Sequence, residues 1–513
     1  MKGIIINADS DGILTGIGNE DLPPASVKDI EDFPMEFEGT QVTDYFLCVS
    51  GTLTTFPSER FESYVSKYHQ KIENGIPVDY SQGSSSFKGA HIVFDELKVD
   101  HNKIQIEGFR KAGINPWISF RMNDVHYRER KTGPCLTEFY HAHPEYRRVP
   151  PGKGFMTTFY DRADDYAHPE IRERIFGMIE ESLARYDPYG IELDFQRELR
   201  LFRYGMEYDG IEILNGFIRE IDTLTHRFEK KYGHEIKFAV RVAPDIQTNF
   251  DFGLDVMQWV REGIVDMVIP AGRWSSNDND MPIKLWHNLL KPYNVTLAPC
   301  IEMRLAPYPA AQMVWPNIET FAAFAASAYA QGADKIYIYN YFRSDITKHF
   351  DKSAPLNFDA EIGVNPLPGY FTVINSIGDP DTVQKMNRRH IVTYKDTQPV
   401  WENNGGIGRQ LPAVISNTGA FKLFVGDIPE GAELTLRLGV KDIEKALAQP
   451  PLVCVNLEPC EFIGSEQDDR FALATVLCYS IPKAAYSNLL CPRVAVEETT
   501  EFTWVEVYVK VTD

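Results

Sequence analysis

Residues 189–197 read YGIELDFQR and decide the fold, because they follow a helix-like segment and form a strand that ends in polar side chains. Apolar and polar residues alternate along this run, so a strand here has two different faces. The apolar face carries Ile191, Leu193 and Phe195, and the polar face carries Glu192, Asp194 and Gln196. In a closed parallel barrel one face of each strand points inward, and polar groups at its carboxyl end stand at the mouth. Asp194 is therefore the first candidate for a catalytic residue.

The acids of this strand have a second interpretation, in which they only support the fold. Arg197, Arg200 and Arg203 follow closely and can pair with them in a structural ion-pair network. Two inward acids on one buried strand cost free energy unless they are used, and this favours a functional site.

Composition limits the class of protein and its partners. With 513 residues, 43% of them hydrophobic, the chain can bury a large core divided over two or three domains. Its formal net charge of -21 repels nucleic acid and anionic membranes, so we expect neither as a partner. Seven scattered cysteines without a Cys-x-x-Cys pair argue against a disulfide framework or a zinc knuckle. Residues 2–9 read as a strand and not as a signal peptide, so we expect a cytoplasmic protein unless a leader was removed.

Strand-like and helix-like segments alternate over the length of one large barrel. We expect eight strands, at residues 3–8, 45–49, 114–121, from 190 onward, 236–242, 265–269, 295–301 and 335–339. We expect helices at residues 58–73, 102–112, 169–186, 209–232 and 318–331, and a loop in the Gly/Ser-rich stretch 83–89. The pattern predicts an α/β fold in which residues 1–384 form a (β/α)8 TIM barrel.

Two further regions stand out from this alternation. From about residue 388 onward, short alternating runs are separated by turn residues, which predicts an all-β sandwich domain over residues 385–513. This domain packs against the barrel or binds glycan, and we favour packing. The long aperiodic segment 122–165 predicts a lid in which His126 or Tyr127 reaches the site. His141 and His143 are expected to brace that lid, since no clear acidic partner completes a metal site around them.

Polar residues collect at the predicted carboxyl ends of the strands, and their mixture of acids, amides, arginines and aromatic rings suits a sugar. Glycoside hydrolysis needs a proton donor and a second carboxylate, with aromatic rings to stack on the sugar. Asp194 and Glu302, at the ends of the fourth and seventh strands, are the predicted catalytic pair. The predicted substrate-binding residues are Asp9, Asp11, Arg121, Asn123, His126, Glu192, Gln196, Arg241, Arg273, Trp274, Asn340 and Tyr341. We expect a carbohydrate substrate, no cofactor and no metal.

Four strings carry a resemblance to a known group of proteins. They are RMNDVH at 121–126, HPEY at 143–146, GIELDFQR at 190–197 and WVREGIVD at 259–266. They resemble the glycoside-hydrolase-like barrel proteins, described as family 10-like, that carry a C-terminal β-sandwich. The resemblance covers most of the chain and implies Asp194 as acid/base and Glu302 as nucleophile. The clan to which family 10 belongs usually has an Asn-Glu pair at the fourth strand, whereas this strand ends Asp-Phe-Gln.

Residues 190–196 also resemble the Asp-Gly-x-Asp-x-Asp-x-Glu signature of chitinase-like family 18 enzymes, with Gly190, Glu192 and Asp194 on matching positions. Gln196 stands where that family keeps its catalytic acid, and an amide cannot donate a proton as a carboxylic acid does. Two functions therefore stay open. One is a retaining, metal-independent glycosidase acting on an oligosaccharide or glycoside, and the other is a carbohydrate-binding barrel without hydrolysis, which Gln196 motivates.

Overall fold

The structure is a computed structural model of the chain. It describes residues 2–9, 11–19, 24, 26–74, 84–126, 128, 133–153, 159–272, 277–302, 305–308, 310–311, 316–340, 370–394, 410–468 and 473–512. The predicted site residues Arg273, Trp274 and Tyr341, and the lid residue Tyr127, lie outside the described residues.

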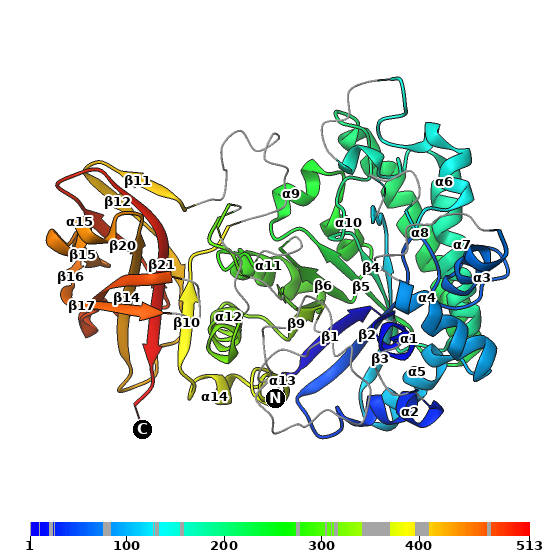
Figure 1. Cartoon of the computed structure of the whole chain (residues 1–513), viewed down its shortest axis with the longest axis horizontal. Helices are drawn as coiled ribbons and strands as arrows, with labels where there is room; N and C mark the ends of the chain where they lie inside the picture. Colours follow the sequence, from blue (N-terminus) through cyan, green and yellow to red (C-terminus); the bar gives the residue numbers. More distant parts are fainter. Residues whose placement is uncertain are drawn as a thin grey trace.

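The N-terminal domain is built on one sheet of nine parallel strands (Figure 1). Their order in space is β7 (Thr296–Leu297), β6 (Met267–Pro270), β5 (Lys237–Val242), β4 (Gly190–Asp194), β3 (Asn115–Arg121), β2 (Val42–Ser50), β1 (Ile4–Asp9), β9 (Ile336–Tyr339) and β8 (Cys300–Ile301). The two end strands are consecutive in the chain, so the sheet curls back toward its own beginning. This is a TIM-barrel-like domain.

The predicted strand at 295–301 is present as two short strands, β7 and β8, with Pro299 in the break between them. Proline has no backbone N–H and cannot complete a ladder of hydrogen bonds. The break is still bridged on both sides: Ala298 N–H donates to the Val268 carbonyl at 3.0 Å, and Tyr337 N–H donates to the Pro299 carbonyl at 3.1 Å. Segment 296–301 is therefore bonded to both of its neighbours and brings the two ends of the sheet together.

The two faces of β4 behave as the alternation predicts. Ile191, Leu193 and Phe195 are buried in the main hydrophobic cluster, which also contains the inward residues of the surrounding helices. Glu192 and Asp194 point to the inside of the curled sheet, because Glu192 reaches side chains of β1 and β9, which are not its neighbouring strands. The apolar part of that interior is Ile5, Phe46, Trp117, Ala239, Met267, Ile269, Ala271, Ala298, Cys300, Tyr337 and Tyr339.

Helices surround the sheet (Figure 1). They are α1 (Asp11–Gly18), α2 (Val27–Met35), α3 (Tyr64–Asn74), α4 (Ser84–His91), the π-helix η1 (Ile92–Glu96), α5 (His101–Lys111), α6 (Glu138–Ala142), η2 (Pro144–Tyr146), η3 (Phe159–Arg162), α7 (Pro169–Arg185), α8 (Glu207–Tyr232), α9 (Ile246–Asp251), α10 (Val256–Arg261), α11 (Ile283–Leu290), η4 (Lys291–Tyr293), α12 (Ile318–Ala330), α13 (Tyr370–Ile374) and α14 (Pro380–Val383). The predictions of α5, α7, α8 and α12 are confirmed, whereas α3 begins six residues later than predicted. Among the described helices, none is both long and apolar enough to cross a membrane.

The loop predicted at 83–89 is wrong, because this stretch forms most of α4. Its small residues serve close packing against α1. A Cβ atom on Gly89 would lie 1.8 Å from the carbonyl oxygen of Leu14, and one on Gly18 would lie 1.8 Å from that of Ser85. The glycines therefore let two helix backbones touch, and they do not mark a turn.

The C-terminal region is a separate β domain of antiparallel sheets. Its elements are β10 (Arg388–Ile391), β11 (Ala413–Ile415), β12 (Thr418–Ala420), β13 (Leu423–Phe424), β14 (Glu433–Val440), α15 (Ile443–Ala448), β15 (Leu452–Val455), β16 (Glu458–Pro459), β17 (Glu461–Asp468), β18 (Leu473–Ser480), η6 (Lys483–Ala485), β19 (Leu489–Leu490), β20 (Pro492–Ala495) and β21 (Thr500–Lys510). The sheets have the orders β10-β21-β14-β18-β17 with β11 beside β21, β12-β20-β15-β16, and β13-β19. One hydrophobic cluster holds residues of all three sheets, among them Leu436, Val453 and Leu423. The domain boundary at 384/385 and the sandwich arrangement stay predictions.

The β domain contacts the barrel domain directly. The side-chain amide of Asn279, in the loop before α11, donates to the carbonyl of Ile391 at 2.9 Å, and its backbone N–H donates to Thr393 Oγ1 at 2.9 Å. Lys422 pairs with Asp280 at 2.8 Å. Figure 1 shows β10 beside α12, at the side of the barrel that faces the β domain.

A buried ion pair lies within the largest sheet of the β domain. Glu506 on β21 accepts hydrogen bonds from Arg389 Nε at 2.7 Å and Nη2 at 2.8 Å, and from Arg437 Nη1 at 3.1 Å. The indole N–H of Trp504 also donates to Glu506, at 3.0 Å. The Glu506 side chain is 0% exposed, so four charge-assisted or polar hydrogen bonds compensate the cost of burying its charge.

Candidate active site

One arginine joins the two acids that the sequence predicts as a pair. Asp194 is the register partner of Arg241 on β5. Arg241 Nη1 donates to Asp194 Oδ1 at 3.0 Å and to Oδ2 at 3.3 Å, while Nη2 donates to Glu302 Oε1 at 2.8 Å. The nearest oxygens of the two carboxylates therefore lie within roughly 8 Å of each other, because both accept from one planar guanidinium. This bound includes the separations of both retaining and inverting glycosidases.

The surroundings of the two acids differ. Burial raises the pKa of Glu302 to about 7, against the opposing charges of Arg241 and Arg197. Asp194 faces Arg241 with both oxygens and also accepts the backbone N–H of Arg197 at 3.1 Å. Hydrogen bonds of this kind are strongest to an ionised carboxylate. The site thus combines one acid with a pKa of about 7 and one that accepts hydrogen bonds from the side chain of Arg241 and the backbone of Arg197.

Glu192 occupies the same inward face, two residues before Asp194. Its Oε2 accepts from the Asn7 amide at 2.9 Å and from the Ser119 hydroxyl, and its Oε1 accepts from Tyr337 at 2.7 Å. Burial, followed by the charge of Asp194, raises its pKa to about 7. Three protein donors bind the Glu192 carboxyl in the interior of the sheet, so it links β1, β3 and β9 beneath the acid pair. Its predicted contact with a substrate stays a prediction.

A cavity of about 140 Å³ opens beside the pair, at the carboxyl ends of β1, β2 and β3. Arg121 on its wall binds Asp9, and it donates to Asp124 at 3.3 Å. Asp124 in turn accepts the backbone N–H of His126 at 2.9 Å and lies 2.6 Å from its Nδ1. The cavity therefore presents two carboxylates, a guanidinium and an imidazole, which are groups that bind sugar hydroxyls well.

His126 connects the cavity to the acid pair. Its Nε2 contacts the guanidinium of Arg197, whose backbone N–H binds Asp194. Burial and the charge of Arg197 lower the pKa of His126, so its imidazole is neutral near pH 7. Sequence reasoning included His126 and Arg121 but missed Asp124, although its position two residues before His126 was a usable signal.

Two other predicted substrate-binding residues, Asn123 and Gln196, have hydrogen-bond partners within the protein, and their contact with a substrate stays a prediction. The amide of Asn123 donates to the carbonyls of Asp164 at 2.9 Å and Arg200 at 3.2 Å and accepts the Asp164 N–H at 3.1 Å. It therefore fastens the long segment 122–165 to the loop after β4. The amide nitrogen of Gln196 donates to the Ala271 carbonyl at 2.7 Å. Asn340 follows β9 and has a left-handed conformation with φ of 54°.

Asp11, also predicted to bind substrate, is the first residue of α1. Within the described residues, neither His141 nor His143 belongs to a group of three or more side chains that could hold a metal ion. His143 stacks on Tyr146 with ring centroids 4.9 Å apart and lies 3.1 Å from Glu145. His141 packs edge-on against Tyr140.

No protein-family model matches the chain, and no curated protein matches it in sequence. Solved structures similar to it include α-L-fucosidase isoenzyme 1 from Paenibacillus thiaminolyticus, with 12% identity over 97% of this chain and 96% of that one and a TM-score of 0.35. The glycoside hydrolase domain of PgaB (BpsB) from Bordetella bronchiseptica has 10% identity over 67% and 94%, with a TM-score of 0.39. The maltogenic α-amylase AmyB from Thermotoga neapolitana has 10% identity over 100% and 99%, with a TM-score of 0.36. These values are too low to transfer any chemistry, and the family 10-like assignment stays a prediction.

Proposed function

We propose that the chain is a glycoside hydrolase acting on an oligosaccharide or glycoside through Asp194 and Glu302. The observation that carries the proposal is Arg241, which binds two inward carboxyl groups at the end of the curled sheet, and one of them, Glu302, has a pKa raised to about 7. Two such groups with different environments are what glycosidic bond cleavage requires.

The roles we propose are exchanged relative to those that the resemblance implies. Asp194, bound as a carboxylate by Arg241 and Arg197, is the nucleophile that attacks the anomeric carbon. Glu302, with its raised pKa, protonates the leaving oxygen and then takes a proton from the water that releases the sugar. Asp9, Arg121 and His126 bind hydroxyl groups in the neighbouring cavity.

The second candidate is a carbohydrate-binding barrel that does not hydrolyse its ligand. A specific observation favours it: Asp194 is 0% and Glu302 2% exposed, and Arg241 occupies both, as in a structural ion pair. A panel of chromogenic glycosides and a glycan array separate the two candidates. Release of the chromophore that Asp194→Asn abolishes supports hydrolysis, whereas array binding by a protein that releases nothing supports the alternative.

The pH profile gives a test of the acid. We expect kcat/KM to fall about tenfold per pH unit above pH 7, because Glu302 must carry the proton that it transfers. Initial rates on one aryl glycoside between pH 5 and 9 measure this. Since Glu192 titrates in the same range, Glu192→Gln is the matched control. If the fall of kcat/KM above pH 7 disappears in Glu192→Gln, the titrating group is Glu192 and not Glu302.

Stability should depend on the same proton. Between its ordinary value of 4.5 and about 7, Glu302 holds a proton in the folded chain that the unfolded chain releases. Its contribution to the free energy of unfolding is therefore fully present below pH 4.5 and is lost as the pH rises through 7. From pH 5 to pH 8 the wild type should lose about 2 to 3 kcal/mol relative to Glu302→Gln, in urea unfolding of both proteins. A difference that stays constant with pH would mean that Glu302 titrates normally.

A further inference from the structure

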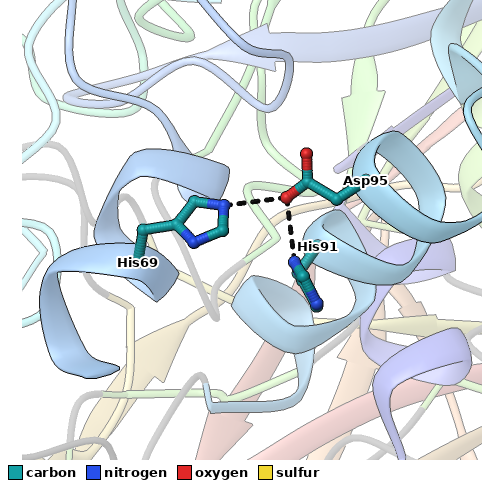
Figure 2. Close-up of side chains that lie close together, drawn as sticks. All are labelled: His69, His91 and Asp95. Carbon is teal, nitrogen blue, oxygen red and sulfur yellow. Dashed lines mark hydrogen bonds and ion pairs between the residues drawn. The ribbon is translucent and has the colours of Figure 1, made fainter. Parts of the chain in front are cut away.

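Three side chains of types that can ligate a metal ion lie close together on the outside of the barrel domain, away from the acid pair. His69 comes from α3, His91 is the last residue of α4, and Asp95 lies in the π-helix η1 (Figure 2). His69 Nε2 and His91 Nδ1 each lie 2.8 Å from the same oxygen, Asp95 Oδ2. All three ligand atoms lie within 4.8 Å of one another.

The packing around the cluster orients these atoms. The ring of Tyr68 stacks on His91 with centroids 4.6 Å apart and an interplanar angle of 18°. The outer nitrogen of His91, Nε2, lies 3.4 Å from Glu96 Oε1. A carboxylate near one ring nitrogen of a histidine favours a proton on that nitrogen, so the other nitrogen can bind a metal. Metal-bound histidines commonly have such a carboxylate beside them.

We propose that His69, His91 and Asp95 form a binding site for a first-row divalent transition-metal ion, for which Zn²⁺ is the representative. Two imidazole nitrogens and one carboxylate oxygen are a common ligand set for such ions, and their affinities follow the order that places Cu²⁺ and Zn²⁺ high. The ion takes the place of the protons now shared between the two rings and Asp95 Oδ2. With three protein ligands, the remaining coordination positions belong to water.

The position of the cluster supports entry of an ion. Its side chains are between 24% and 42% exposed, so solvent reaches them without unfolding. The chain as a whole carries a net charge of -21, which attracts cations.

A metal here would tie two crossover helices together. α3 begins at Tyr64, which lines the cavity at the carboxyl ends of β1, β2 and β3. Tyr64 already packs edge-on against Phe87 of α4, with ring centroids 4.8 Å apart. The ion would connect α3 and α4 a second time, through His69 and His91, and it would not contact a substrate.

The test uses the full chain without a histidine tag, freed of metal by a chelator and dialysed. We expect ZnCl₂ titrated calorimetrically at pH 7.5 to bind with one equivalent at this site. His69→Gln, His91→Gln and Asp95→Asn should each weaken that binding at least tenfold, and the Zn²⁺-dependent rise in melting temperature should disappear in each. His234→Gln is the matched control, because His234 has comparable exposure and lies 2.6 Å from a single carboxylate, Asp187.

Two results would overturn the proposal. One is the absence of saturable Zn²⁺ binding to the wild type, which would leave the cluster as a hydrogen-bonded contact between helices. The other is binding of unchanged affinity in the His69→Gln/Asp95→Asn double variant. Melting curves in the presence of chelator verify that each variant folds, and Asp95→Asn, which preserves shape, keeps the test decisive if a histidine variant does not.

Discussion

Glu302→Gln should hydrolyse an unactivated glycoside at least about 1,000-fold more slowly than the wild type, because the leaving oxygen loses its proton donor. The same variant should keep much of its kcat/KM on a 2,4-dinitrophenyl glycoside, whose leaving group needs no proton, while kcat falls because Glu302 no longer takes the proton from the attacking water. Stability near pH 4.5 should change little, since an amide and a protonated carboxyl are both neutral beside Arg241. Steady-state kinetics on the two substrates, with melting temperatures, measure these effects.

Asp194→Gly supplies the complementary half of this test. It should lose hydrolysis of both substrates, and sodium azide should restore turnover on the dinitrophenyl glycoside by filling the space of the missing nucleophile. The Asp194→Asn protein should also be less stable, since Arg241 loses a buried partner to which it donates two hydrogen bonds. Azide can also accelerate a variant that lacks the acid/base, but it then gives a glycosyl azide of retained configuration. A glycosyl azide of inverted configuration from a Glu302 variant would restore the roles that the resemblance implies. Wild-type rates in both variants would move the site elsewhere.

Glu506→Gln should lower the free energy of unfolding of the β domain by about 3 to 5 kcal/mol, because it leaves Arg389 buried without its charged partner. Denaturant unfolding followed by far-UV circular dichroism measures the loss. Glu466→Gln is the matched control: Glu466 pairs with Arg437 at 2.8 Å, but its side chain is 54% exposed, so its removal should cost less than about 1 kcal/mol. Equal losses in the two variants would contradict the importance of burial.

The sequence was sufficient for the framework of the barrel domain because strand alternation and helix periodicity are local. The run at 189–197 shows this, since its apolar and polar faces point as predicted. Helix α4 was missed because the glycines that allow it to touch α1 have the composition of a loop. Contacts between residues far apart in the chain carry no local signal of that kind.

The candidate site shows the same division. Asp194, Arg241 and Glu302 were each placed at a strand end, but their order in the chain does not reveal that one guanidinium lies between the two acids. Asn123 has the side chain of a sugar ligand, and only the fold shows that Asp164 and Arg200 already occupy it. The metal-ligating cluster was invisible because His69 and His91 belong to different helices, one of them mistaken for a loop.

The break at Pro299, between β7 and β8, is the place where the two ends of the curled sheet meet. β4 is hydrogen-bonded along its whole length to β3 and β5, whereas β7 and β8 each have only two paired residues on their bonded side. Local unfolding of a sheet costs the least free energy where the fewest hydrogen bonds join neighbouring strands. Glu302 directly follows β8, so we expect local opening at this break to move Glu302 more than Asp194, which ends the fully paired strand β4. The two acids are therefore held by parts of the sheet with different numbers of backbone hydrogen bonds: Asp194 by the fully paired β4, and Glu302 by the short strand β8.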